Sequence, residues 1–315
     1  GAGFPRSRPP SPHLGVMKKS NNPLLYPLSW LYGLGVGLRN FLFNQGILKQ
    51  QSYPIPLICV GNITVGGTGK TPHVELLISI LRKQYRIAVI SRGYKRKSRG
   101  LREVTLTSTA EEVGDEPKQI KQKYPEVRFV VDGNRRRAMR YLLALPEEER
   151  PEVVLLDDGF QHRYVQPSFN ILLIDAQREL HDDELLPLGG LREPATARYR
   201  ADCIILTKCP HDMQPIKLRI MQRNLDLYAH QEIFFSRIHY QQPRAVRTLL
   251  GESGSPLPKD ALVIALSGIA SPGLFFSYLA ERYELIDQLV YPDHHQFRRK
   301  DFTAISERWQ EGAHS

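Results

Sequence analysis

The sequence predicts an α/β protein: a mostly parallel sheet flanked by helices, a smaller second α/β domain, and an N-terminal amphiphilic helix. Short runs rich in Val, Ile and Leu, typical of strands buried on both faces, lie at residues 55–60, 86–91, 127–131, 153–156, 170–174 and 203–207. Helical stretches alternate with them at residues 71–82, 116–123, 135–143 and 216–224. This alternation favours a parallel sheet covered by helices on both sides.

The second domain is predicted from a further strand-like segment at residues 231–240 and from two apolar runs beyond it. Those runs, residues 262–267 and 285–291, bracket a helical segment at residues 272–281. We therefore divide the chain into a core of residues 51–230 and a second domain of residues 231–315. Residues 1–16 are rich in Pro, Ser and Gly, and we expect a disordered tail there, either natural or left from expression.

The charge balance narrows the class of partner. The 315 residues carry a net charge of +10, which suits nucleic acid, an anionic membrane face or a phosphorylated substrate. Neither zinc-ligand spacing nor an RNA-binding aromatic signature accompanies the basic clusters, so nucleic acid is not the expected partner. Three cysteines form no disulfide framework and fit a reducing cytosol.

Residues 24–43 are apolar and aromatic but are interrupted by Pro27 and by glycines. A membrane-spanning helix needs about 20 predominantly apolar residues, and this run barely reaches that length. Its Trp and Tyr residues and the flanking Lys18 and Lys19 favour an interfacial helix. We expect residues 17–50 to form a helix associated with the cytosolic leaflet; the alternative is a helix packed on the core.

Residues 60–72 join a strand to a helix through a glycine-rich loop that ends in Gly69-Lys70-Thr71, the layout of a phosphate-binding P-loop. Backbone N–H groups of such a loop surround phosphate oxygens, and the helix N-terminus adds positive potential. Lys70 would reach the β- and γ-phosphates, and the Thr71 hydroxyl would bind Mg²⁺. Thr64 stands where the usual pattern has its first Gly, so the alternative is a turn that merely joins the two elements.

Acidic residues follow two other predicted elements. Asp157 and Asp158 end the apolar run 153–156, where P-loop enzymes place the carboxylate that holds Mg²⁺. In a Pro- and Gly-rich loop, Arg192 could clamp phosphate and Glu193 could complete the metal shell, although such pairs are usually surface ion pairs. Asp115 begins a helix and is either a cap or a general base.

Two rival classes lack their distinguishing residue. Partitioning ATPases carry a lysine before the paired glycines, where this chain has Val65. GTPases read guanine with an Asp in the segment that here reads Thr207-Lys208-Cys209-Pro210, and Pro210 occupies that position.

Together these motifs resemble the tetraacyldisaccharide 4′-kinase (lipid A 4′-kinase) family of Gram-negative bacteria. The matching segments, in family order, are residues 60–72, 91–94, 113–117, 157–163, 186–194 and 292–295. Asp-Asp-Gly-Phe-Gln-His-Arg and Leu-Arg-Glu-Pro are the distinctive ones, and the family shares Thr64. The resemblance implies a P-loop NTPase-like core and ATP-dependent phosphorylation of the 4′-hydroxyl of a lipid-linked glucosamine disaccharide 1-phosphate.

The resemblance also assigns roles to residues. Lys70 and Arg192 would act on the phosphoryl group, Asp115 would be the base, and His294 would tune it. The nucleotide would contact Thr64, Val65, Gly66, Gly67, Thr68, Gly69, Lys70, Thr71, Tyr94, Arg135, Gln161 and His162, with Arg92 also lining the site. Mg²⁺ would be bound by Thr71, Asp157, Asp158 and Glu193.

The remaining implications concern location and completeness. The family acts on an anionic lipid at the cytosolic face of the inner membrane, and we expect a peripheral or N-terminally anchored monomer. Relatives continue with a segment containing Thr-Glu-Lys-Asp, so we expect the chain to be C-terminally truncated. The alternative function is a membrane-associated P-loop ATPase or adaptor that hydrolyses ATP without transferring phosphate.

Overall fold

The computed structural model describes residues 22–178, 180–243, 257–269, 272–292, 295 and 297–313. The chain forms two compact units, which divide between Ile238 and His239. Each unit is described by itself.

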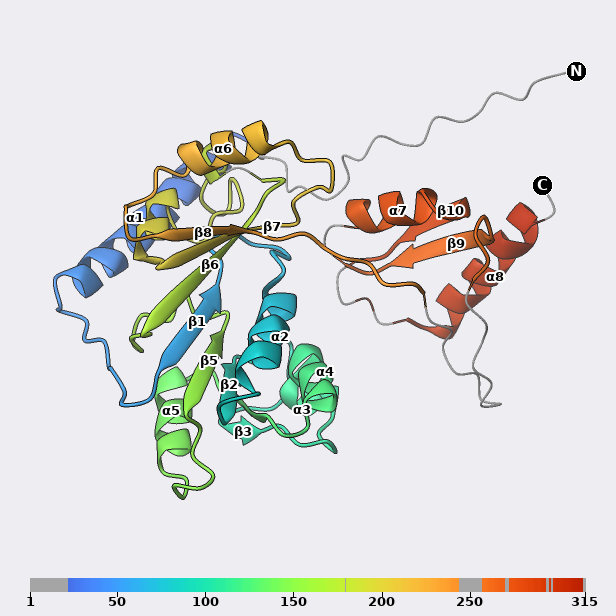
Figure 1. Ribbon diagram of the computed structural model, residues 1–315. Coiled ribbons are helices and arrows are strands. Elements are labelled where there is room, and N and C mark those ends of the chain that lie inside the picture. The colour runs from blue at the N-terminus through green and yellow to red at the C-terminus, as the bar shows by residue number, and fades with distance from the viewer. Residues whose placement is uncertain are drawn as a thin grey trace, which may run out of the picture. The chain divides into compact units, whose positions relative to one another are not determined.

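The first unit is built on an eight-stranded sheet with the strand order β3-β4-β2-β5-β1-β6-β7-β8 (Figure 1). The strands are β1 (Leu57–Gly61), β2 (Ile87–Ser91), β3 (Arg102–Glu103), β4 (Arg128–Val131), β5 (Val153–Asp157), β6 (Phe169–Asp175), β7 (Cys203–Thr207) and β8 (Glu232–Phe235). Only the short β3 runs antiparallel to its neighbour. The predicted fold class, a mostly parallel sheet flanked by helices, is confirmed.

Helices cover both faces of this sheet (Figure 1). The helices are α1 (Leu25–Asn44), α2 (Lys70–Leu81), α3 (Ala110–Val113), α4 (Asp115–Lys123), α5 (Arg135–Leu143) and α6 (Pro215–Asn224), with the 3-10 turns η1 (Leu180–Asp182) and η2 (Ala195–Arg200). Apolar residues of α2, α3 and α4 pack in one core layer, and those of α5, η2 and α6 pack in the other. Because β2 and β5 lie between the layers, all five residues of each are buried.

The two central strands bring the predicted motifs to one edge of the sheet. Strand β1 pairs in parallel with β5 on one side and with β6 on the other. The loop after β1 leads to Lys70, β5 ends at Asp157, and β2 ends at Ser91. Ligands of open α/β sheets bind outside these carboxyl ends, so the fold alone places the site there.

Helix α1 has inverted polarity. Most of its exposed side chains are apolar: Leu28, Trp30, Leu31, Leu34, Leu38 and Phe41 are each more than half exposed. Its buried or half-buried residues recur at helical spacing and include Ser29, Tyr32, Gly33, Val36, Arg39, Asn40 and Phe43. Within the described residues, no helix combines the length and the hydropathy needed to cross a bilayer.

The second unit contains β9 (Leu262–Ser267), α7 (Gly273–Ala280), β10 (Glu284–Val290) and α8 (Arg299–Ala313). Strands β9 and β10 pair in parallel, so α7 is a crossover helix between them. Ala265, Phe276 and Leu279 form its small buried core. The strand–helix–strand order is the one that the sequence predicts, but the segment 231–240, which the sequence analysis assigned to this domain, contributes β8 to the sheet of the first unit, where it pairs with β7.

Gly61, the last residue of β1, packs closely against the loop that follows β5, and a substitution at Gly61 tests this packing. A Cβ atom at Gly61 would lie 2.6 Å from Phe160 Cβ and 2.9 Å from Phe160 N. We expect Gly61→Ala to lower the free energy of unfolding by about 1–3 kcal/mol, as overpacking does. Urea unfolding followed by circular dichroism measures the change.

Gly35→Ala is the matched control, because a Cβ at Gly35 in α1 meets no atom within 4 Å. Replacing a helical Gly by Ala stabilises by about 0.5–1 kcal/mol. Equal effects of the two substitutions would contradict the packing argument.

Candidate active site

The P-loop is held in an extended conformation at its start. Thr64 forms an antiparallel bridge with Leu191, Val65 N donates to Gly190 O at 2.7 Å, and Arg192 N donates to Ile63 O at 2.7 Å. A residue in a β-bridge does not need the left-handed backbone region, so Thr is accommodated where other P-loops have Gly. The loop does use that region further on, at Gly66 (φ 105°) and Gly69 (φ 84°).

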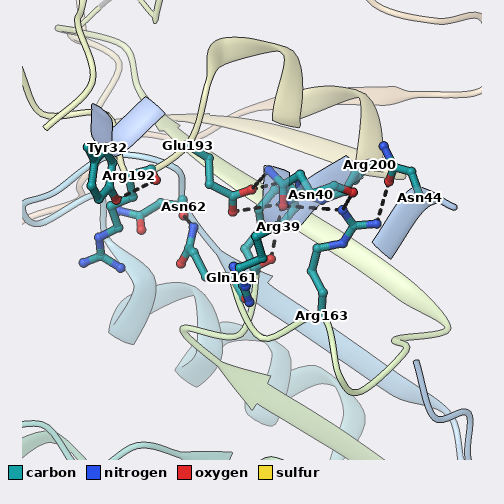
Figure 2. Close-up of polar contacts among 11 residues, drawn as sticks. Tyr32, Arg39, Asn40, Asn44, Asn62, Gln161, Arg163, Arg192, Glu193 and Arg200 are labelled. Atoms are coloured by element: carbon teal, nitrogen blue, oxygen red, sulfur yellow. Dashed lines mark hydrogen bonds and ion pairs between the residues drawn. The ribbon is translucent and has the colours of Figure 1, made fainter. Parts of the chain in front are cut away.

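Thr68, in the middle of the loop, is fixed from two sides. Asn62 Nδ2 donates to Thr68 Oγ1 at 2.9 Å, and Thr207 Oγ1, at the end of β7, donates to Thr68 O at 2.9 Å. All three residues are buried. Asn62 is itself held by Gln161, whose Nε2 donates to Asn62 O at 2.7 Å (Figure 2). The motif that follows β5 therefore supports the strand that precedes the P-loop.

A buried ion pair supports the loop from the side of β6. Arg178 lies 2.6 Å from Asp183, and its Nη1 donates to Val65 O at 3.1 Å. Asp183 Oδ1 accepts from Gly190 N at 2.9 Å, and Gly190 in turn accepts from Val65. A Cβ at Gly190 would lie 1.8 Å from Arg178 Nη2, which explains the glycine. Sequence reasoning missed this pair, because no local pattern joins the two residues.

Lys70 and Arg192, two predicted site residues, both contact the carboxylate of Asp158. Lys70 Nζ lies 3.5 Å from Asp158 Oδ1, and Arg192 Nη1 lies 3.2 Å from both Asp158 oxygens. Burial alone would raise the pKa of Asp158, but Lys70 and Arg192 outweigh it and lower that pKa below its ordinary value. Asp158 itself has φ 49°, a left-handed conformation that is uncommon for a residue with a side chain.

Thr71, the first residue after the P-loop lysine, faces a carboxylate that the sequence did not single out for metal binding. Thr71 Oγ1 donates to Glu116 Oε2 in a short hydrogen bond. Glu116 lies in the first turn of α4, directly after Asp115. The sequence signal for Glu116 was its place as the second acid of Asp115-Glu116. A helix N-terminus favours acids in its first turn in any case, so this signal does not point to the contact with Thr71.

Asp157, at the end of β5, is buried and only half satisfied. Ser91 Oγ donates to its Oδ2 at 2.9 Å, while its buried Oδ1 has no hydrogen-bond partner among the described residues. Burial, followed by repulsion from Asp158, raises the pKa of Asp157 to about 6, and Glu116 adds to the repulsion. A cation beside these carboxylates would remove both penalties.

Arg135 and His162 form the positive side of the site. Arg135 is 3% exposed, and its Nε and Nη2 atoms have no hydrogen-bond partner among the described residues. Burial lowers its pKa, whereas Asp157 and Asp158 act to raise it. Burial, reinforced by Arg135 and Arg92, lowers the pKa of His162 to about 4, so this imidazole is neutral at physiological pH.

The loops after β2 and before α4 approach each other closely. A Cβ at Gly93 would lie 2.8 Å from Val113 O, and one at Gly114 would lie 3.1 Å from Tyr94 O. This contact brings Asp115 to the segment that carries Arg92 and Tyr94. The Tyr94 side chain is 64% exposed at this edge.

Among the predicted site residues, Glu193 makes its side-chain contacts with η2 and α1. Both carboxylate oxygens of Glu193 accept from Arg200, at 2.9 and 3.0 Å, and Oε2 also accepts from Asn40 Nδ2 at 2.9 Å (Figure 2). The structure thus engages Glu193 with η2 and α1, and it is Glu116 that contacts Thr71. His294 lies outside the described residues.

No group of three or more His, Cys, Asp or Glu side chains that could hold a metal ion occurs within the described ranges. Mg²⁺ is usually bound by one or two carboxylates together with substrate phosphates and water, so a cage of protein ligands is not required. The oxygen donors here are hard ligands, and the unpartnered Asp157 Oδ1 fits such a cation.

The parallel sheet, the Gly-Lys-Thr loop at the start of α2 and the strand-end aspartates together define a P-loop nucleotide-binding protein. Residues 21–314 match the family described as Tetraacyldisaccharide-1-P 4′-kinase. The chain belongs to this family.

Similar proteins extend the match. The tetraacyldisaccharide 4′-kinase of Porphyromonas gingivalis is 51% identical over 290 residues, 92% of this chain and 80% of the relative. That of Parabacteroides distasonis is 48% identical over 90% of this chain and 78% of the relative. A crystal structure of LpxK from Aquifex aeolicus in complex with ATP is similar with a TM-score of 0.64 and 33% identity, and covers 85% of this chain and 81% of that one.

The raised pKa of Asp157 gives a pH-dependent prediction. Between its ordinary value of 3.8 and about 6, the folded state binds a proton that the unfolded state has released, so stability falls as pH rises through this window. Asp157→Asn removes that penalty of about 3 kcal/mol at most. We expect it to stabilise the nucleotide-free protein at pH 7.5, with a smaller gain at pH 5, in urea unfolding.

Asp182→Asn is the control for this experiment, since the Asp182 side chain is 76% exposed. A gain from Asp157→Asn that is equal at both pH values, or a loss at pH 7.5, would contradict the assignment.

Proposed function

We propose that the chain transfers the γ-phosphoryl group of ATP to the 4′-hydroxyl of a tetraacyldisaccharide 1-phosphate. Family membership makes it a kinase, and the relatives carry the name of this reaction. The observation that carries the proposal is the convergence of Lys70 and Arg192 on Asp158 beside the P-loop. Phosphoryl transfer needs cations that are positioned before the reaction begins, and this carboxylate positions two of them.

Asp158 has a second role in this proposal, as the group that phosphate replaces. Lys70 is 17% exposed and Arg192 28% exposed, so both can reach a ligand without large movement. Phosphate oxygens carry more charge than one carboxylate and accept bidentate hydrogen bonds from Arg. ATP would therefore draw Lys70 and Arg192 partly away from Asp158.

The carboxylate that this exchange releases fits a magnesium ion. We assign Thr71, Asp157 and Asp158 to the Mg²⁺ environment, and we add Glu116 because it contacts Thr71. The ion would neutralise charge on the β- and γ-phosphates. Glu193 is assigned a supporting role instead, since Arg200 and Asn40 engage its carboxylate.

We assign Asp115 and Arg135 to the side of the site where the attacking hydroxyl would bind. Asp115 immediately precedes Glu116 on α4, and the contact of Glu116 with Thr71 supports a place for Asp115 beside the transferred phosphate. A carboxylate there can accept the proton of an attacking hydroxyl. Arg135 is buried beside Asp157 and Asp158, and its Nε and Nη2 atoms have no partner among the described residues, so it suits an anionic group of either substrate. The neutral His162 adds a hydrogen-bonding group without adding charge.

We also propose that α1 lies in the cytosolic face of the inner membrane. Six of its large apolar residues are each more than half exposed, while Ser29, Arg39 and Asn40 are buried or half-buried against the protein. Burying such side chains in a lipid interface gains about 1.5–3 kcal/mol each. The net charge of +10 adds attraction to anionic lipids.

The base is tested by Asp115→Asn with γ-labelled ATP and the disaccharide 1-phosphate lipid. We expect label transfer to fall by about 10²–10⁴-fold, the contribution of a general base, while ATP affinity changes little. Thin-layer separation of labelled lipid from free phosphate measures the reaction. Glu111→Gln, at an exposed acid of α3, is the matched control.

Retained transfer by Asp115→Asn would remove Asp115 from the mechanism. Label that enters only free phosphate in the wild-type reaction would favour the rival function, an ATPase or adaptor.

Membrane contact is tested by the double substitution Leu31→Glu with Leu34→Glu. We expect co-sedimentation with vesicles of anionic phospholipid to fall at least tenfold, because two apolar contacts are lost and two repelled charges are gained. Leu76→Glu with Ile80→Glu makes the same change on exposed positions of α2. An equal loss in both variants would indicate that net charge, and not α1, governs binding.

A further inference from the structure

The polar face of α1 raises a question that membrane contact does not answer. An interfacial helix needs only an apolar outer face, and an apolar inner face would pack it more simply onto the protein. Instead, α1 directs Ser29, Tyr32, Arg39 and Asn40 inward, and each makes a hydrogen bond to a residue more than 100 positions away. Figure 2 shows the bonds of Tyr32, Arg39 and Asn40. Every acceptor lies in a segment that borders the phosphate site.

Arg39 begins a direct line of hydrogen bonds to the P-loop. Arg39 Nη2 donates to Gln161 O at 2.6 Å, and Gln161 Nε2 donates to Asn62 O at 2.7 Å. Asn62 Nδ2 then donates to Thr68 Oγ1 at 2.9 Å. Asn62 and Thr68 are 0% and 3% exposed, so water cannot replace these bonds. Three hydrogen bonds thus join α1 to the middle of the loop.

Tyr32 reaches the other side of the site. Its hydroxyl donates to Arg192 O at 2.9 Å, and Arg192 N donates to Ile63 O at 2.7 Å. The guanidinium of the same Arg192 pairs with Asp158. The backbone of Arg192 therefore contacts both α1 and the segment before the P-loop, while its guanidinium contacts Asp158.

Asn40 and Arg163 fix the helix against the same region. Asn40 donates to Glu193, the residue after Arg192, and Glu193 is buried in its pair with Arg200. Arg163 Nη2 donates to Asn44 Oδ1 at 2.8 Å, and its Nη1 donates to Asn40 O at 3.2 Å. These bonds leave α1 little freedom to slide relative to residues 161 and 192.

We propose that Tyr32 and Arg39 are positioning residues for phosphate binding: α1 sets the geometry of the P-loop through Gln161 and of the Arg192 clamp through its carbonyl. This proposal rests on the proposed kinase function and adds to the membrane role of α1. Neither side chain needs to touch ATP. A displacement of about 1 Å in groups that hold a reacting phosphate can cost on the order of 100-fold in rate.

The test compares Tyr32→Phe and Arg39→Gln with Tyr26→Phe, which makes the same change at a half-exposed tyrosine of the same helix. ATP affinity is measured with a fluorescent ATP analogue and Mg²⁺, without lipid, on the full chain. We expect Tyr32→Phe and Arg39→Gln each to weaken binding by about 3- to 30-fold, the range for loss of one partly buried hydrogen bond. Arg39→Lys, which keeps a donor, is expected to recover part of the loss, and Tyr26→Phe to match wild type.

The kinetics of label transfer give a second measurement, the KM values for ATP and for the lipid, which a loss of stability alone would not change. With folded protein at 20 °C, we expect KM for ATP to rise in Tyr32→Phe and Arg39→Gln while KM for the lipid stays near the wild-type value. Wild-type ATP affinity in both variants would overturn the positioning role alone. An equal loss in Tyr26→Phe, or a loss that follows the unfolded fraction in thermal melts, would also overturn it. A wild-type chain that binds no ATP analogue would overturn the kinase function and this proposal together.

Discussion

One carboxylate shared by two cations organises this site. Asp158 holds Lys70 from the P-loop and Arg192 from a loop far along the chain, so groups that would otherwise repel each other stand side by side before phosphate arrives. The cost is a residue in left-handed conformation, which the packed end of β5 enforces. Preorganisation of this kind avoids the reorganisation that free lysine and arginine side chains would need at the moment of transfer.

The neighbouring charges follow from this arrangement. Lys70 and Arg192 form their ion pairs with Asp158, and Asp157 is buried with one unpartnered oxygen and a raised pKa. Glu116 approaches through Thr71 and increases the local negative charge, while Arg135 balances it from α5. The site therefore keeps unused hydrogen-bonding capacity of both kinds: Asp157 Oδ1 has no donor, and Arg135 Nε and Nη2 have no acceptor, among the described residues. A nucleotide with its metal supplies partners for both at once, which is a physical reason for the two to bind together.

Sequence reasoning predicted the position of a side chain correctly where that position follows from a strand or helix end. Buried apolar runs identified the strands around β1, and Lys70, Asp157 and Asp158 lie at the edge that parallel strands dictate. It missed β3 and α3, which are too short for a periodic pattern. It also missed the Arg178–Asp183 pair and the contact of Glu116 with Thr71, because tertiary packing creates both. The role expected of Glu193 stays a prediction, and packing adds contacts that its sequence neighbours do not indicate, since its carboxylate accepts from Asn40 and Arg200.

Helix α1 shows how one segment can satisfy two surroundings. Its outer face carries large apolar side chains that water does not favour, and its inner face carries, beside Val36 and Phe43, hydrogen-bonding groups that lipid does not favour. The helix cannot rotate without losing the bonds from Tyr32 and Arg39. In the membrane placement that we propose, that same orientation turns the exposed apolar side chains toward lipid, so the helix at the lipid surface is hydrogen-bonded to the loops of the phosphate site.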